Sequence, residues 1–220
     1  MLRGLAQWDR LIIAETFAAE NADATGRTVG EVAAARGGEP FDTLLDIVIA
    51  DELRTGLTPP LTGDDAADWR MRAEVWRHPG AVIGGSDAGA HLDMMCGAVY
   101  TTSLLGKGVR EHQVVTLEEA VRLVTDAPAR FYGLTERGQI APGWHADLVL
   151  FDPATIGHGP ERTRYDLPSG APRLVADAYG ISSVLVSGVE VCRDGAATGA
   201  MPGTVLRSGR DTETVSASAR

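Results

Sequence analysis

The sequence predicts an α/β fold that gives way to a β-rich region in the last third of the chain. Up to about residue 137, short apolar runs of strand length alternate with helical patterns that carry capping residues. From about Gly138, strand patterns follow one another without intervening helices. We therefore expect two parts, residues 1–137 and 138–207, followed by a polar, flexible tail at 208–220.

The first part opens with a buried strand and two helices. Leu11 to Ala14 is a short apolar run typical of a strand. Thr28 and Glu31 have the spacing of a capping box, in which a hydroxyl and a carboxylate accept hydrogen bonds from the free N–H groups of a helix start. This helix is expected to stop at Gly37-Gly38. A second helix is expected from Pro40, because proline suits the first helical position.

The second helix has an amphipathic pattern. Its apolar stripe, which is expected to face the core, comprises Leu44, Ile47 and Val48. Its acids are expected to face water or the helix start, and they are Asp42, Asp46 and Asp51. Residues 55–68 are rich in Thr, Pro, Gly and Asp, which predicts a loop.

A helix, a strand and a capped helix complete the first part. Trp69 to His78 predicts a short helix. Ala81-Val82-Ile83 predicts a short buried strand that runs directly into Gly84-Gly85-Ser86-Asp87. Thr116 to Glu119 is a second capping box, whose helix is expected to halt before Pro128.

The β-rich region contains strands joined by tight turns. Asp147 to Asp152 and Ser183 to Val186 are apolar runs of strand length. Ser187-Gly188 predicts a turn into a strand at Val189 to Cys192, and Asp194-Gly195 predicts another turn.

Composition excludes several classes of partner and location. Thirty acids against twenty bases give a formal net charge of −10, with no cluster of Lys or Arg, so nucleic acid is not expected as a partner. Cys96 and Cys192 form no CxxC pair, which favours a reducing compartment. Met1 to Asp9 lacks a signal-peptide pattern, and no apolar run approaches the ~20 residues that span a bilayer. We expect a soluble, cytoplasmic protein with no membrane partner.

The strongest local indication of chemistry is the segment from Gly84 to Asp93. Asp87 follows the predicted strand at its carboxyl end, where α/β folds place reacting groups. The two glycines before it allow a tight backbone and a close approach of substrate. Capping of a turn is the structural alternative for Asp87, because Asp often occupies that position.

Further polar residues, within this segment and beyond it, allow other interpretations. Ser86 lies in a Gly-x-Ser-x-Ala sequence, close to the nucleophile elbow of serine hydrolases. His91 and Asp93 carry groups that suit zinc, although a histidine near an acid is more often a hydrogen-bonding partner. None of the five histidines forms HxH or HExxH. Arg130 is expected to pair with a helix end or an acid.

Residues 138–152 read G-Q-I-A-P-G-W-H-A-D-L-V-L-F-D, which resembles the amidohydrolase superfamily, whose C-termini read G-x-I-x-x-G-x-x-A-D-L-V. Thr116 to Ala120, with the Pro128-Ala129 and Gly133-Leu134 pairs that follow, looks like the N-acyl-D-amino-acid deacylase (D-aminoacylase) branch. The closing Gly199 to Gly203 fits the same branch. The resemblance covers about residues 8–207, and its motifs are specific as a set.

The resemblance implies a fold and a chemistry. The fold is a partial TIM-like (β/α) barrel, consisting of its last strands and helices, followed by a small β-rich C-terminal lobe. In that family a barrel holds one or two divalent metals, usually zinc. An aspartate that ends the eighth strand takes a proton from metal-bound water and passes it to the leaving amine. Ser86-Asp87 matches that position, which makes Asp87 the candidate general acid/base and metal contact. His91 is the candidate substrate-binding residue.

The chain also departs from the family pattern. The HxH pair and the further metal ligands of the family belong upstream of the residues present, and a full barrel takes about 250 residues. The expected protein is therefore a metal-dependent hydrolase of non-peptide carbon–nitrogen bonds, acting on a small-molecule amide, whose chain is inactive alone. The alternative is a non-catalytic module that complements a separate N-terminal half, because exposed strand edges favour pairing with another chain or with a second copy. An independent serine hydrolase using Ser86 is the third reading.

Overall fold

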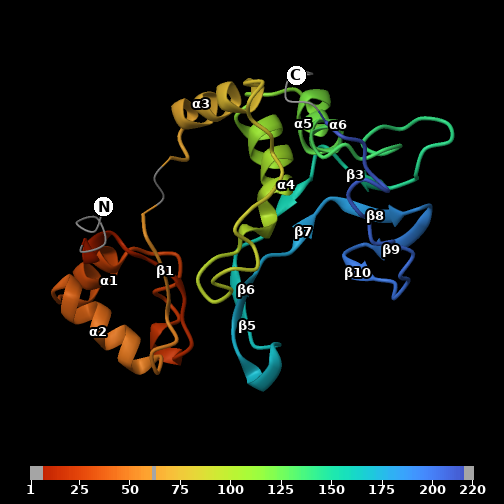
Figure 1. Cartoon of the computed structure of the whole chain (residues 1–220). Coiled ribbons are helices and arrows are strands. Elements are labelled where there is room, and N and C mark those ends of the chain that lie inside the picture. Colours follow the sequence, from red (N-terminus) through yellow and green to blue (C-terminus); the bar gives the residue numbers. More distant parts are fainter. Residues whose placement is uncertain (1–6, 61–62, 216–220) are drawn as a thin grey trace. The chain divides into compact units, whose positions relative to one another are not determined.

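The computed structural model describes residues 7–60 and 63–215, and its mixture of helices and strands confirms an α/β fold class (Figure 1). The chain divides into two compact units. Unit 1 comprises Met1–Asp64 and Glu161–Arg173, and unit 2 comprises Asp65–Pro160 and Leu174–Arg220. The predicted division at residues 137 and 207 stays a prediction. The sequence features at residues 1–6 and at 216–220, including the end of the predicted tail, lie outside the described residues.

Unit 1 contains the predicted strand and both predicted helices, which lie side by side in Figure 1. Thr28 Oγ1 accepts a hydrogen bond from the Glu31 N–H at 3.2 Å, and Glu31 Oε2 accepts one from the Thr28 N–H at 2.8 Å, so the predicted capping box is confirmed. The first helix ends at Gly37, which has a left-handed φ of 72°. The bounds are β1 (Ile12–Glu15), α1 (Val29–Arg36), α2 (Pro40–Ala50) and β2 (Gly56–Thr58).

The core of unit 1 forms where α1 and α2 pack against the start of β1. The buried residues of this core are Leu11, Ile13, Ala24, Val29, Val32, Leu44 and Ile47, with Val48 packed against them. The predicted stripe of α2 is therefore confirmed. Two expectations about the chain around α2 are wrong. Asp51 does not face water or the helix start but is fully buried. The predicted loop at 55–68 contains β2, which pairs antiparallel with β1.

The helices of unit 2 match the predicted ones in part. The predicted helix at Trp69 to His78 is found with an earlier start, and the capped helix after Thr116 is also found. Glu119 does not complete the second capping box, because its carboxylate bonds to Arg77 instead. A π-helix was not predicted. The bounds are α3 (Ala66–Arg77), α4 (Tyr100–Ser103), the π-helix η5 (Leu104–Glu111), α5 (Leu117–Val124) and α6 (Asp126–Phe131).

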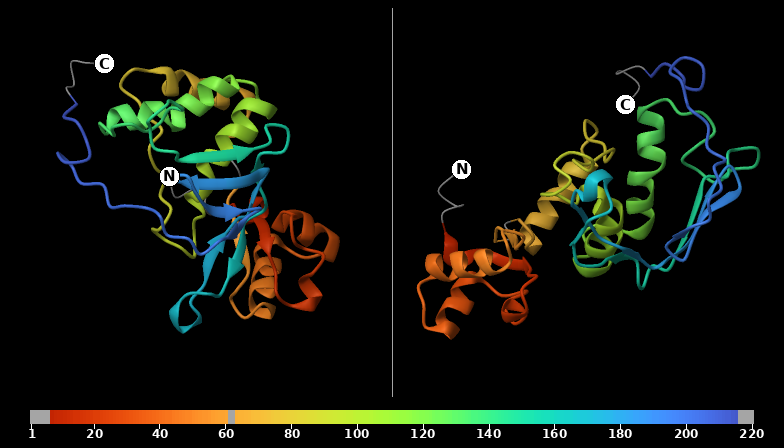
Figure 2. Two further views of the ribbon diagram at one scale, coloured as in Figure 1. Left: turned by 90° about the vertical axis from the view of Figure 1, so that its right-hand side faces the viewer. Right: turned by 90° about the horizontal axis from the view of Figure 1, so that it is seen from below.

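The sheet of unit 2 has the antiparallel order β10-β9-β8-β3. Ser187 and Gly188 have φ values of 50° and 78°, as a two-residue hairpin turn between β8 and β9 requires, so the predicted hairpin is confirmed. Figure 2 shows the helices on one side of this sheet. The bounds are β3 (Leu148–Phe151), β8 (Ile181–Val186), β9 (Val189–Arg193) and β10 (Ala196–Ala197).

The core of unit 2 joins the helices to the sheet. Its buried residues are Ala73, Leu104, Leu105, Val115, Ala120 and Ile156, and partly buried Phe151 and Ile181 of the sheet pack against them.

Short strand pairs that the sequence did not predict lie elsewhere in the described chain: β4 (Gly157–His158) with β7 (Ala178–Tyr179), and β5 (Arg162–Arg164) with β6 (Arg173–Val175). Among the helices described, none is long and apolar enough to cross a lipid bilayer.

Candidate functional site

The segment that leads to Asp87 is extended but is not a β-strand. Ala81, Val82 and Ile83 are half-buried, and the predicted strand is wrong for them. The Ala81 N–H bonds back to the His78 carbonyl at 2.9 Å, which closes the turn after α3. A strand requires a neighbour to pair its N–H and C=O groups. No strand in residues 7–60 or 63–215 pairs with these residues, so their apolar character alone does not make a strand.

Asp87 lies in a turn that its own backbone stabilises. Its carbonyl accepts a hydrogen bond from the Ala90 N–H at 3.1 Å, and its side chain is exposed. The neighbouring Ser86 Oγ accepts a hydrogen bond from the Ala88 N–H at 3.2 Å. A Cβ at Gly97 would come within 3.0 Å of Ala88 N and 3.3 Å of Ser86 Oγ, so the chain at Gly97 lies directly against this turn. The turn is therefore held by its own hydrogen bonds and by contact with the chain at Gly97, and the Asp87 side chain is exposed.

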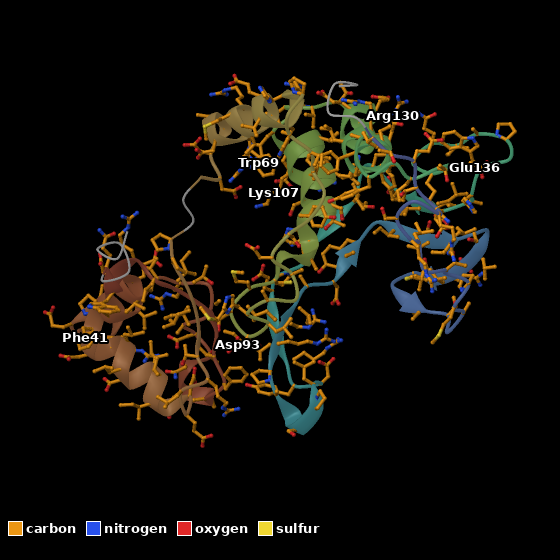
Figure 3. The ribbon with its side chains drawn as sticks, in the orientation of Figure 1. Phe41, Trp69, Asp93, Lys107, Arg130 and Glu136 are labelled. Carbon is orange, nitrogen blue, oxygen red and sulfur yellow. The ribbon has the colours of Figure 1, made fainter. Side chains whose placement is uncertain are left out.

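His91 and Asp93 occupy the next turn of the same loop. His91 has a left-handed φ of 49°, and its carbonyl accepts hydrogen bonds from the N–H groups of Met94 at 2.9 Å and Met95 at 3.0 Å. The Leu92 carbonyl accepts a further bond from the Leu174 N–H at 2.7 Å. The side chains of His91 and Asp93 are exposed, and Figure 3 labels Asp93 on this loop. Backbone contacts thus hold the loop, and its polar side chains are available to a ligand.

The described residues do not fit a metal ion. Within residues 7–60 and 63–215, no three side chains of His, Cys, Asp or Glu lie close enough together to hold one. A structural zinc site takes four protein ligands and a catalytic one takes three. Asp87 and His91 therefore do not form such a site with the other described residues.

The structure also gives hydrogen-bond partners for two other residues that the sequence analysis named, Arg130 and Ser86. Arg130 Nε donates to Asp126 Oδ1 at 2.8 Å, so the predicted pairing of Arg130 with an acid is confirmed. Burial acts to raise the pKa of Asp126, but the hydrogen bonds from Arg130 and Gln139 outweigh it and hold that pKa below its usual value. For Ser86, the hydrogen bond to Oγ comes from its own loop.

Tyr132 is a polar neighbour that the sequence did not single out. A Cβ built at Gly84 would lie 3.7 Å from the Tyr132 hydroxyl, which places that hydroxyl beside the approach to Asp87. Its ring meets Phe131 edge to face at 4.9 Å. Tyr132 follows α6, far from Asp87 along the chain, so no local pattern could indicate the proximity. Its hydroxyl can donate or accept a hydrogen bond next to the candidate site.

Comparisons with known proteins agree with the resemblance seen in the sequence. The model of the amidohydrolase family matches residues 6–192. The chain is 41% identical over 109 residues to an N-acyl-D-aspartate deacylase of Alcaligenes xylosoxydans xylosoxydans, covering 49% of this chain and 20% of that protein. It is 32% identical over 184 residues to a D-aminoacylase of the same organism, covering 83% of this chain and 34% of that protein.

Solved structures of the same kind are also similar. A crystal structure of D-aminoacylase is 30% identical, with a TM-score of 0.45, covering 87% of this chain and 36% of that one. An N-acyl-D-glutamate deacylase from Bordetella bronchiseptica, described with zinc and a phosphonate inhibitor, is 28% identical, with a TM-score of 0.45, covering 90% and 38%.

The chain spans between 20% and 34% of the length of these curated relatives. The family match nevertheless covers most of the chain, and it includes Asp87, His91 and most of the β-rich region. The chain therefore belongs to the amidohydrolase family and resembles its N-acyl-D-amino-acid deacylase branch.

Proposed function

We propose that this chain contributes the proton-transferring carboxylate of a hydrolase that cleaves the amide bond of N-acyl-D-amino acids. The observation that carries the proposal is the family match over residues 6–192, in which Asp87 stands on an accessible, hydrogen-bonded turn. The relatives named as N-acyl-D-aspartate deacylase and D-aminoacylase support this substrate class. The partial TIM-like barrel and the β-rich lobe are the fold that we propose for these residues in the complete enzyme.

Asp87 has the chemistry that amide cleavage requires. The amine leaves an amide only when its nitrogen receives a proton. Water attacks the amide carbon more readily when a base removes a proton from the water. A carboxylate can take the proton from the attacking water and return it to the departing nitrogen. The products are a carboxylic acid and a free amino acid. His91, four residues further along the accessible loop, is the proposed contact to the substrate.

The proposal also covers the metal that enzymes of the family hold. One relative is described with zinc, but the described residues of this chain do not fit a metal ion. We therefore propose that the chain does not hydrolyse amides by itself, and that side chains other than those described supply the ligands. Zinc, when held in that way, supplies a Lewis acid to the reaction.

A second candidate is a non-catalytic module that completes a separately encoded N-terminal half. Among the described strands, β3 forms one of the two edges of its sheet, and its Val149 and Leu150 are about half exposed. A largely apolar cavity of about 480 Å³ lies between this edge and the helices, lined by residues that include Leu105, Val124 and Val184. An apolar strand edge above a cavity favours pairing with another strand. A second polypeptide would supply that strand, and so would a second copy of this chain.

The first experiment measures metal content and amidase activity of the purified chain. N-acetyl-D-glutamate, N-acetyl-D-aspartate and N-acetyl-D-methionine serve as substrates, and their L-forms serve as controls. We expect less than one zinc per chain and no turnover. Tightly held, stoichiometric zinc together with turnover would show that the chain is self-sufficient, which would overturn the proposed incompleteness.

The second experiment tests Asp87 in an active form, obtained by adding a polypeptide that carries the metal ligands. Asp87→Asn is expected to lower kcat at least ~100-fold, because general acid–base catalysis contributes about 10²–10⁴-fold. Asp93→Asn, which removes an exposed carboxylate from the same loop, is the matched control and is expected to retain most activity. Near-normal rates in Asp87→Asn would remove Asp87 from the mechanism. His91→Ala is expected to raise KM more than it lowers kcat.

A further inference from the structure

A cavity of about 260 Å³ lies within unit 2, between the end of α3, the segment at residues 79–82, and helices α5 and α6. Its walls are largely apolar and include Trp76, Val82, Leu123 and Phe131. Leu123 is only 3% exposed, so the walls continue into the packed interior. The cavity thus offers a short hydrocarbon group apolar side chains against which to pack.

The rim of this cavity carries an excess of positive charge. The charged or titratable side chains that line it are Arg77, His78, Arg122 and Arg130. Two carboxylates pair with these arginines: Glu119 accepts hydrogen bonds from Arg77 at 2.6 and 2.8 Å, and Asp126 accepts one from Arg130 at 2.8 Å. The hydrogen bonds from Arg77 to Glu119, and from Arg130 and Gln139 to Asp126, outweigh burial and hold the pKa of both acids below its usual value, with a smaller contribution from attraction to Arg122. Three guanidinium groups therefore face two carboxylates in a chain whose formal net charge is −10.

His78 presents a hydrogen-bond donor at the same rim. Its Nδ1 accepts a hydrogen bond from the Gly80 N–H at 3.0 Å. A neutral imidazole that accepts at Nδ1 carries its proton at Nε2, so that nitrogen is a donor. Arg122 presents up to five further N–H donors in a planar fork, which matches a carboxylate. The rim therefore combines positive charge with donors.

We propose that this cavity binds a small amphipathic anion, namely a carboxylate on a short hydrocarbon body. The carboxylate meets Arg122 and His78, and the hydrocarbon occupies the space between Trp76 and Phe131. The volume is below the roughly 300–1,000 Å³ of pockets for drug-sized ligands, which restricts the hydrocarbon to a few carbons. The proposal does not depend on Asp87, because neither Asp87 nor His91 lines this cavity. Figure 3 shows Arg130 well separated from Asp93 on the candidate catalytic loop.

The test separates the contribution of charge from that of the apolar body. The whole chain is titrated with sodium hexanoate, with hexan-1-ol and with sodium sulfate, and binding is followed by calorimetry and by tryptophan fluorescence. Trp76 lines the cavity and reports on its occupation. Hexanoate is expected to saturate and to bind at least about tenfold more tightly than either hexan-1-ol or sulfate, since each of these has only half of the required chemistry. Added salt is expected to weaken hexanoate binding.

Two variants locate the site. Arg122→Gln is expected to weaken hexanoate about fivefold and to leave hexan-1-ol unchanged, because only the charge is lost. Arg70→Gln removes the same charge from the exposed side of α3 and is expected to have no effect, which controls for the overall field of the chain. Ala127→Leu fills the cavity and is expected to weaken both hexanoate and hexan-1-ol, with the folded state checked by circular dichroism.

The outcomes decide the proposal. Selective, saturable binding of hexanoate that Arg122→Gln weakens supports it. Equal binding of hexanoate and hexan-1-ol, equal effects of the Arg122 and Arg70 variants, or no saturable binding of hexanoate would overturn it. None of these outcomes depends on amidase activity, so the failure of this proposal is distinguishable from the failure of the proposed function.

Discussion

Asp51 is the residue of unit 1 whose replacement has the most predictable effect on stability. Its side chain is fully buried at the end of α2. Oδ1 accepts hydrogen bonds from the Phe17 N–H at 3.1 Å, the Ala18 N–H at 2.8 Å and Asn21 Nδ2 at 3.0 Å. Oδ2 accepts one from the Thr55 hydroxyl at 2.7 Å. Through these hydrogen bonds, one carboxylate at the end of α2 connects the loop after β1 to the chain before β2.

The magnitude follows from what truncation leaves behind. Asp51→Ala removes the acceptor of four donors, and each buried donor left unsatisfied costs about 1–3 kcal/mol. Because these costs do not add and water enters part of the cavity, we expect a loss of about 3–5 kcal/mol in the free energy of unfolding. Asp51→Asn keeps an acceptor at Oδ1, and the Thr55 hydroxyl can accept from the new amide, so the expected loss is about 1–2 kcal/mol.

The dependence on pH has a definite sign. Burial acts to raise the pKa of Asp51, but hydrogen bonds from Thr55, Ala18, Asn21 and Phe17 outweigh it and hold the pKa below its usual value. A carboxyl whose pKa is lowered by folding stabilises the protein fully above the ordinary pKa of about 3.9. This stabilisation is lost as the pH falls through the lower pKa of the folded state. The stability difference between wild type and Asp51→Asn is therefore expected to shrink below about pH 4.

Urea unfolding followed by circular dichroism measures the loss, and hydrogen exchange resolved by segment locates it. Exchange is expected to rise around Phe17 to Asn21 and to stay unchanged in η5 of unit 2. Asp46→Ala, which removes an exposed acid from the same helix, is the matched control and should change stability by less than about 0.5 kcal/mol. If Asp51→Ala were no more destabilising than Asp46→Ala, the account of Asp51 as the acceptor that joins these segments would be refuted.

Two further predictions concern local backbone features. Gly138→Ala is expected to cost about 2–4 kcal/mol, because φ is +85° and a Cβ there would lie 2.7 Å from the Cβ of buried Ala129. Gly143→Ala has a similar φ of +86° but nothing within 4 Å, so about 1 kcal/mol is expected, and equal losses in urea unfolding would contradict the contribution of crowding. Thr28→Ala is expected to cost about 1 kcal/mol and to speed hydrogen exchange in α1, because the cap hydroxyl is lost, and unchanged exchange would argue against the cap.

Local features of the fold could be predicted where the physical cause is local. The helix starts at Thr28 and Pro40 and the turn at Ser187-Gly188 each depend on a few neighbouring residues, and the structure has each of them where expected. The π-helix could not be predicted, because its pattern does not differ from that of an α-helix in so short a segment. The predicted strand at Ala81 to Ile83 is wrong because a strand depends on a partner, which apolar residues alone do not provide.

The candidate site divides in the same way. The motif around Ser86-Asp87 and the resemblance to the family could be recognised from the sequence, because both depend only on the order of residues along the chain. The position of Tyr132 beside Gly84 and the pairing of Glu119 with Arg77 required the folded chain. So did the exposure of Asp87 on a turn supported by Gly97.

By itself the sequence determined the family resemblance, the candidate acid, and the order of a set of helices and strands, namely β1, α1, α2, α3, α5, β3, β8 and β9. Only the tertiary structure decided that Asp51 is buried and that Asp87 is exposed, although both are aspartates next to apolar segments. It also decided that three arginines and a histidine from α3, α5, α6 and the turn after α3 gather around one apolar cavity. The physical reason is that burial, pKa and charge clustering depend on contacts between residues far apart along the chain, which no local pattern specifies.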